Sequence, residues 1–252
     1  MFPIGDENER GHGPAFVSLA FIGLNIAVFL LLQGAGGPSG EDFTYGYSAV
    51  PFEITTGTDL VEPEPITIDG QEQLVPQEPG PSPIWLTLLT SMFMHGGWLH
   101  IFGNMLFLWI FGDNVEHRIG HIPYLAFYVI AGVVASFAQI LVNTDSVIPT
   151  LGASGAISGV LGAYLVMFPT NRVTVLMLRF PMQVPALVAI GLWAVFQFIS
   201  GIAAFGTAGE GGGVAYMAHI GGFVAGLVAG LVFRALFHDP RRPRGAPASA
   251  YG

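Results

Sequence analysis

The stretch MAHIGGFVAGLVAGLVF, residues 217–233, contains no Asp, Glu, Lys or Arg and belongs to a charge-free run from Gly211 to Phe233. About 20 apolar residues cross a bilayer as a helix. Small residues recur at every fourth position of this run: Ala218, Gly222, Gly226 and Gly230. Such a stripe lets a second helix approach closely. The stretch therefore predicts a membrane-spanning helix that packs tightly and carries His219 near its start.

The rest of the chain has the composition of a membrane protein. Of its 252 residues 52% are hydrophobic and 10% charged, against about a quarter charged in soluble domains. Further apolar segments of spanning length cover residues 11–40, 79–112, 122–142, 146–171 and 180–209. We expect an all-α membrane protein with one domain of six transmembrane helices at 14–237. Residues 1–13 should be a cytoplasmic N-terminus and 238–252 a basic cytoplasmic tail.

The positive charges predict the orientation of these helices. All eight are arginines, and arginine-rich loops stay in the cytoplasm. With a cytoplasmic N-terminus, all eight fall at cytoplasmic ends: Arg10, Arg118, Arg172, Arg179, Arg234, Arg241, Arg242 and Arg244. We therefore expect both termini in the cytoplasm and a multi-pass protein of the plasma membrane. Because cysteine is absent, disulfides and thiol chemistry are excluded.

The first external loop, residues 34–97, should be acidic. Nine acidic residues and no basic ones lie there: Glu41, Asp42, Glu53, Asp59, Glu62, Glu64, Asp69, Glu72 and Glu78. The composition favours a solvated, Pro-rich connector over a dedicated binding surface. Within it, the alternation over residues 66–71 with Asp69-Gly70 predicts a hairpin. Residues 84–94 predict a helix at the membrane interface, anchored by Trp85.

Ser154 and His219 are the candidate nucleophile and base. Ser154 stands in Gly152-Ala153-Ser154-Gly155, at the outer end of the fourth span. That span, ending at Pro169, is short, so its serine end should lie below the surface. A sixth helix that starts near Val214 buries His219 by roughly 7 Å. The depths agree, and Gly155, Gly159 and Ala163 form a matching small-residue stripe.

The second span adds His95, His100 and Asn104. His100 and Asn104 are i, i+4 neighbours on one helix face. Donors at this depth can stabilise a developing oxyanion, together with the Ser154 backbone N–H at a helix N-terminus. Each feature alone also fits a plainer interpretation: a GxSG match by coincidence, or a hydrogen-bonded core histidine. A zinc site is disfavoured, because no glutamate follows either histidine in the His-Glu-x-x-His manner and thiolates are absent.

At these residues the chain resembles the rhomboid intramembrane serine proteases, over roughly residues 14–233. The resemblance rests on four motifs in order: His95-x4-His100-x3-Asn104, Gly112-x3-Glu116, Gly152-Ala153-Ser154-Gly155, and Ala218-His219-x2-Gly222-x3-Gly226. It implies a six-helix bundle and a Ser154–His219 dyad without a third acid. It also implies an oxyanion pocket from His100, Asn104 and the Ser154 amide, supporting roles for His95 and Gly152, and substrates that are transmembrane segments. We expect no cofactor, metal or nucleic acid partner.

Two departures from the family pattern bear on the site. Many bacterial relatives have an aromatic residue four positions after the serine that packs on the histidine, whereas this chain has Ser158. Many also carry a Trp-Arg pair in the first external loop, which here has no arginine. The Gly-rich loop 206–213 could cap the site. The alternative function is a non-proteolytic scaffold or transporter, in which buried histidines relay protons or hold a client helix.

Overall fold

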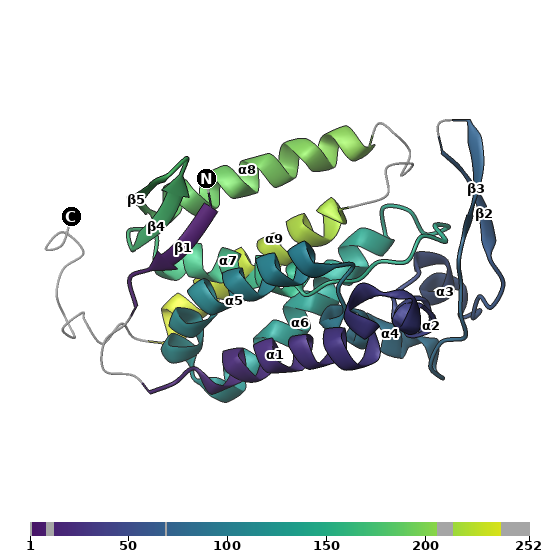
Figure 1. Cartoon of the computed structure of the whole chain (residues 1–252). Coiled ribbons are helices and arrows are strands. Elements are labelled where there is room, and N and C mark those ends of the chain that lie inside the picture. Colours follow the sequence, from purple (N-terminus) through teal and green to yellow (C-terminus); the bar gives the residue numbers. More distant parts are fainter. Residues whose placement is uncertain (1, 9–12, 69, 206–213, 238–252) are drawn as a thin grey trace, which may run out of the picture.

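The computed structural model describes residues 2–8, 13–68, 70–205 and 214–237 (Figure 1). Its body is a helical bundle with one small β-sheet at each end. The bundle helices are α1 (Phe16–Ala27) with its continuation η1 (Val28–Leu32), α5 (Trp98–Ile119), α6 (His121–Ile140), α7 (Ser154–Met167), α8 (Ala186–Phe205) and α9 (Tyr216–Leu236). The predicted loop cap at 206–213 and the tail at 238–252 lie outside the described residues.

Three helices of the described chain are long and apolar enough to cross a membrane: His121–Ile140, Ala186–Ala203 and Tyr216–Leu236. Shorter apolar helices cover Phe16–Leu32, Ile84–Phe93 and Ser154–Met167. α5 has 22 residues, but Asp113, Glu116 and Arg118 lie in its last two turns. The chain is therefore a mostly helical membrane protein, and length and composition support three of the six expected spans.

α7 is the central helix, and α9 packs directly against its backbone. A Cβ added at Gly222 would lie 2.1 Å from the carbonyl oxygen of Gly155, and one at Gly226 would lie 1.9 Å from that of Gly159. No side chain fits into such a contact. The predicted small-residue stripes on these two helices therefore face each other, and they set the distance between α7 and α9.

The N-terminal segment, for which the sequence analysis predicted only a cytoplasmic location, contains a β-strand. β1 (Phe2–Asp6) pairs with β4 (Arg172–Met177), which pairs with β5 (Phe180–Pro185), in an antiparallel sheet of order β1-β4-β5. Residues 180–185 of the apolar segment 180–209 thus form a strand, and the helix of that segment, α8, starts at Ala186. The alternating burial of β4, with Val173 and Val175 inside, is the strand pattern that was overlooked.

The first loop is more ordered than the solvated connector we had expected. α2 (Glu41–Tyr47) and α3 (Pro51–Thr56) precede the predicted hairpin, which is confirmed as β2 (Glu64–Ile68) and β3 (Gln71–Val75). The predicted helix at 84–94 consists of three short turns, η4 (Ile84–Leu86), α4 (Thr87–Thr90) and η5 (Ser91–Phe93). Ala49, which is buried, forms an isolated β-bridge with Thr150, so the loop is tied to the segment that leads into α7.

Glu116 connects the start of α1 to the end of α5. Its carboxylate accepts hydrogen bonds from the backbone N–H groups of Val17 and Ser18, both at 2.8 Å. These N–H groups have no partner within their own helix, and a negative charge at a helix N-terminus also interacts favourably with the helix dipole. The side chain of His121, the first residue of α6, lies 2.5 Å from the same carboxylate. Glu116 thus holds three helices together.

Asp6 anchors β1 to the bundle. Its Oδ2 accepts hydrogen bonds from the hydroxyl of Tyr164 at 2.5 Å and from the amide of Asn114 at 2.7 Å. Burial raises the pKa of Asp6 from its ordinary acidic range to about 7, and the charges of Asp113 and Glu7 add to the rise. The docked strand therefore favours the protonated carboxyl group.

We predict that β1 docks more weakly as the pH rises from about 4 to about 7. The carboxyl group of Asp6 binds its proton more tightly when β1 is docked. The proton therefore stabilises docking fully at pH values below the pKa of Asp6 in the undocked strand. This stabilisation is lost as the pH rises through the pKa of Asp6 in the docked strand. Hydrogen-exchange protection of residues 2–6 should fall over this range, after correction for intrinsic exchange. Asp6→Asn should make the protection independent of pH. A falling profile that survives in Asp6→Asn would contradict the assignment.

Gly226→Ala should destabilise the bundle by about 1–3 kcal/mol, the usual cost of overpacking. The added methyl group meets backbone, which cannot rotate away. Gly23→Ala is the matched control, because a Cβ at Gly23 in α1 meets nothing within 4 Å. Thermal unfolding in one detergent measures both variants. Equal midpoints for Gly226→Ala and the wild type would refute the close packing of α7 and α9.

Candidate functional site

Ser154 and His219 lie within hydrogen-bonding distance. Ser154 is the first residue of α7, and His219 stands in the first turn of α9. The distance between Ser154 Oγ and His219 Nε2 is 2.7 Å, although the residues are 65 positions apart in the chain. Both side chains are half-buried. The close packing of the two helices thus brings a hydroxyl group and an imidazole ring together in the way a nucleophile and its base require.

The second ring nitrogen of His219 contacts a residue that the sequence analysis missed. His219 Nδ1 lies 2.9 Å from Oε1 of Gln197 on α8, a side chain that is 8% exposed. The sequence feature that was overlooked is the amide side chain of Gln197 in a charge-free span. Polar groups in such a span are costly and often functional. The rings of Trp193 and Tyr216 lie 6.3 and 6.5 Å from the His219 ring, centroid to centroid.

Ser158 takes no part in orienting the His219 ring. Its hydroxyl donates to the backbone oxygen of Ser154 at 2.6 Å, along its own helix. The ring of His219 instead has Gln197 and Trp193, both from α8, as neighbours.

His100 lies on the other side of the serine, next to Gly152. Gly152 has φ +131°, and a Cβ there would lie 2.9 Å from Nε2 of His100 and 3.5 Å from Oγ of Ser154. Glycine is therefore required by both its backbone angle and the space. His100 Nδ1 accepts a hydrogen bond from the Gly96 N–H at 3.3 Å. In the neutral ring Nε2 then carries the proton and is a donor beside Ser154.

Asn104 offers a second donor one helical turn further along α5. The side chain is 8% exposed, and its Nδ2 has no hydrogen-bond partner among the described residues. An unsatisfied buried donor costs about 1–3 kcal/mol. Groups of this kind are therefore rare in a structural core and call for a specific explanation.

We had expected His95 to lie in the second span, but it lies outside that helix. It precedes Gly97, where the chain turns into α5. Gln33 holds its backbone, accepting from the His95 N–H at 2.8 Å and donating to the His95 carbonyl at 3.1 Å. The ring is 1% exposed, and its centroid lies 5.0 Å from that of His100. His95 thus packs against His100 rather than against Ser154.

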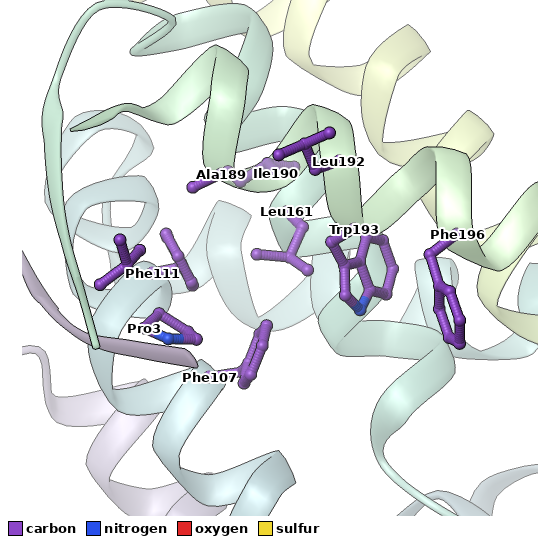
Figure 2. A pocket seen from close by; sticks show the side chains of 10 residues that line it. Pro3, Phe107, Phe111, Leu161, Ala189, Ile190, Leu192, Trp193 and Phe196 are labelled. Atoms are coloured by element: carbon purple, nitrogen blue, oxygen red, sulfur yellow. The ribbon is translucent and has the colours of Figure 1, made fainter. Parts of the chain in front are cut away.

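Two hollows flank the site. A small one of about 30 Å³ beside Ser154 is lined by residues that include Ser136, Gln139 and Ala218, and a space of this size can hold a water molecule. A larger apolar pocket of about 280 Å³ lies between α5 and α8 (Figure 2). Phe107, Phe111, Trp193 and Phe196 line it, together with Pro3 of β1. Trp193 thus borders both this pocket and the His219 ring.

In the part of the chain that the structure describes, no three His, Asp or Glu side chains come together in a way that could hold a metal ion. The polar groups near Ser154 include the rings of His219 and His100 and the turn at Gly152, and Gln139 lines the hollow beside the serine. They are suited to proton transfer and hydrogen bonding, which is the chemistry of acyl transfer.

Comparison with known proteins places this site in a recognised domain. The model of the rhomboid domain matches residues 83–236, which include every site residue above. The chain is 32% identical over 149 residues to the mitochondrial Rhomboid protein 1 of Saccharomyces cerevisiae, covering 58% of this chain and 41% of the relative. It is 31% identical over 159 residues to the rhomboid protease GluP of Bacillus subtilis, covering 63% and 26%. The matches thus span less than half the length of either relative.

Proposed function

Because the chain belongs to the rhomboid family, we propose that it is an intramembrane serine endopeptidase that cleaves transmembrane segments of other membrane proteins. Ser154 is the nucleophile and His219 its base. The observation that carries this proposal is the 2.7 Å contact between Ser154 Oγ and His219 Nε2. The relative GluP of Bacillus subtilis is a rhomboid protease, which agrees with such an activity.

The reaction proceeds by acyl transfer. As Ser154 Oγ attacks the scissile carbonyl carbon, His219 Nε2 takes the hydroxyl proton. The protonated ring then gives this proton to the leaving amine when the C–N bond breaks, which leaves an ester on Ser154. A water molecule attacks the ester, His219 takes its proton, and the freed serine regains one. The small hollow beside Ser154 has room for that water.

The tetrahedral intermediate carries its negative charge next to α5. Asn104 Nδ2 and His100 Nε2 are donors there, and the first is without a partner among the described residues. Donors that wait unpaired for a developing charge stabilise the transition state more than the ground state. In this proposal the amide of Asn104 is one of the donors to the oxyanion.

The membrane arrangement that we propose has six spans, with α1–η1, α5 and α7 crossing beside the apolar helices α6, α8 and α9. α7, with 14 residues, is about 21 Å long, less than the ~30 Å hydrocarbon core. Its Ser154 end therefore lies below the outer surface, where water can reach it. The arginines favour cytoplasmic termini, and we propose the plasma membrane as the location.

Ser154→Ala and His219→Ala should each lower kcat by ~10⁴-fold or more, and the double variant should be little worse than either, because the two residues act as one unit. Cleavage of a panel of single-span reporter substrates by purified protein measures this. The serine change should leave the unfolding midpoint within a few degrees. Retained cleavage by a folded Ser154→Ala protein would refute the assignment. Binding without cleavage by the wild type would favour a scaffold.

Asn104→Ala should lower kcat by ~10²- to 10³-fold, the usual cost of removing an oxyanion donor, with little change in KM. Asn25→Ala is the matched control, since Asn25 is also a buried amide on a bundle helix, where it donates to Phe21 O at 2.7 Å. It should affect stability and leave kcat unchanged. If Asn104→Ala raises KM at constant kcat, Asn104 is a substrate contact instead.

A further inference from the structure

Gln197 is the residue of this site whose chemistry the proposed function leaves unused. It stands on α8, whose sequence from residue 186 to 205 is otherwise almost entirely apolar. A buried amide in such a helix is costly unless it forms hydrogen bonds. Its Oε1 lies 2.9 Å from His219 Nδ1, on the side of the ring opposite Ser154. The amide therefore contacts Nδ1, the ring nitrogen of His219 that Ser154 does not contact.

The contact has a direct consequence for the position of the ring proton. A carbonyl oxygen only accepts hydrogen bonds, so a bond to Gln197 Oε1 requires the proton on Nδ1. Nε2 then has a free lone pair facing Ser154 Oγ, which a base must have in order to take the hydroxyl proton. In the opposite tautomer, Nε2 would carry the proton toward Ser154, and the Gln197 amide would have to rotate and present its NH₂ group to Nδ1 instead of Oε1.

We propose that Gln197 is a positioning residue that holds His219 in the tautomer able to accept the Ser154 proton, and that it stabilises the protonated ring formed during the reaction. This inference rests on the proposed function of Ser154 and His219. Gln197 does not touch the reacting atoms, so it acts through His219. It supplies the orienting contact that Ser158 cannot give, because the Ser158 hydroxyl is bonded to the Ser154 backbone.

The neighbouring rings support a positioning role. Trp193, one turn before Gln197 on α8, lies 6.3 Å from the His219 ring and 5.8 Å from that of Phe223 on α9. These contacts pack α8 against α9 at the level of the site. Ser154 and His219 stand on α7 and α9, which backbone contacts hold together. The orienting group therefore comes from a third helix, and a productive site requires α8 to be packed in place.

Two substitutions separate positioning from packing. Gln197→Leu keeps the approximate volume and removes the acceptor, so kcat should fall about 10- to 100-fold, part of the ~10²- to 10⁴-fold that a general base contributes, with KM nearly constant. Gln197→Glu keeps an acceptor and adds negative charge, so it should restore much of the kcat. The acid limb of its kcat/KM profile should move to higher pH, because a carboxylate favours the protonated ring. Among the described residues, His100 is the titratable side chain whose charge acts on the His219 ring.

Ile199→Leu, at a position on α8 that is 63% exposed, is the control and should behave as the wild type. A residue that merely packs would give the reverse order for the two Gln197 variants. The leucine variant would then be active, and the buried charge of the glutamate variant would unfold or inactivate the protein. That order, with an unshifted pH profile, would overturn the proposal.

A spectroscopic measurement tests the tautomer without relying on cleavage. In protein labelled with ¹⁵N-histidine, the His219 signals, assigned by their loss in His219→Ala, should show a protonated Nδ1 and an unprotonated Nε2. Gln197→Leu should shift this balance toward a protonated Nε2. An unchanged spectrum and unchanged kcat in Gln197→Leu would overturn the positioning role, while the proposed function stands if Ser154→Ala is inactive. Full cleavage by Ser154→Ala would instead overturn the proposed function, and this inference with it.

Discussion

The backbone contact between α7 and α9 is the constraint on which the rest of the structure depends. Carbonyl oxygens of Gly155 and Gly159 lie where a Cβ of Gly222 or Gly226 would be, so neither helix can rotate or slide without a clash or a gap. In a membrane, where lipid tails are as apolar as the side chains, such packing is a main source of helix association. It also fixes the first turns of the two helices relative to each other, and Ser154 and His219 stand in those turns.

The neighbouring helices α5 and α8 carry further polar side chains beside the central pair α7 and α9. α5 contributes His100 near Ser154 and carries Asn104 one turn further along, and α8 contributes Gln197, which contacts His219 Nδ1. Ser154 and His219, the proposed nucleophile and base, therefore stand on a tightly packed pair of helices, while the groups that we propose assist them come from helices around it. An apolar pocket separates α5 from α8. Polar groups inside a bilayer are costly, and the proposed reaction would explain why four helices carry them.

Much of this could be predicted from the sequence, because helix periodicity places residues four apart on one face. The small-residue stripes, the pairing of Ser154 with His219 and the hairpin after Glu64 follow from local patterns. The sheet of β1, β4 and β5 could not be found in this way, because β1 pairs with a strand far along the chain. Gln197 was missed for a similar reason: its position on α8 relative to His219 depends on how α8 packs against α9.

The most direct test of the account asks whether Ser154 is an activated nucleophile. An ordinary serine does not react with a fluorophosphonate, whereas one with an adjacent base does. Purified wild-type protein should be labelled on Ser154 alone, as located by mass spectrometry of the modified peptide, and His219→Ala should remain unlabelled although its Ser154 is intact. Labelling of folded His219→Ala at the wild-type rate, or no labelling of the wild type, would contradict the account.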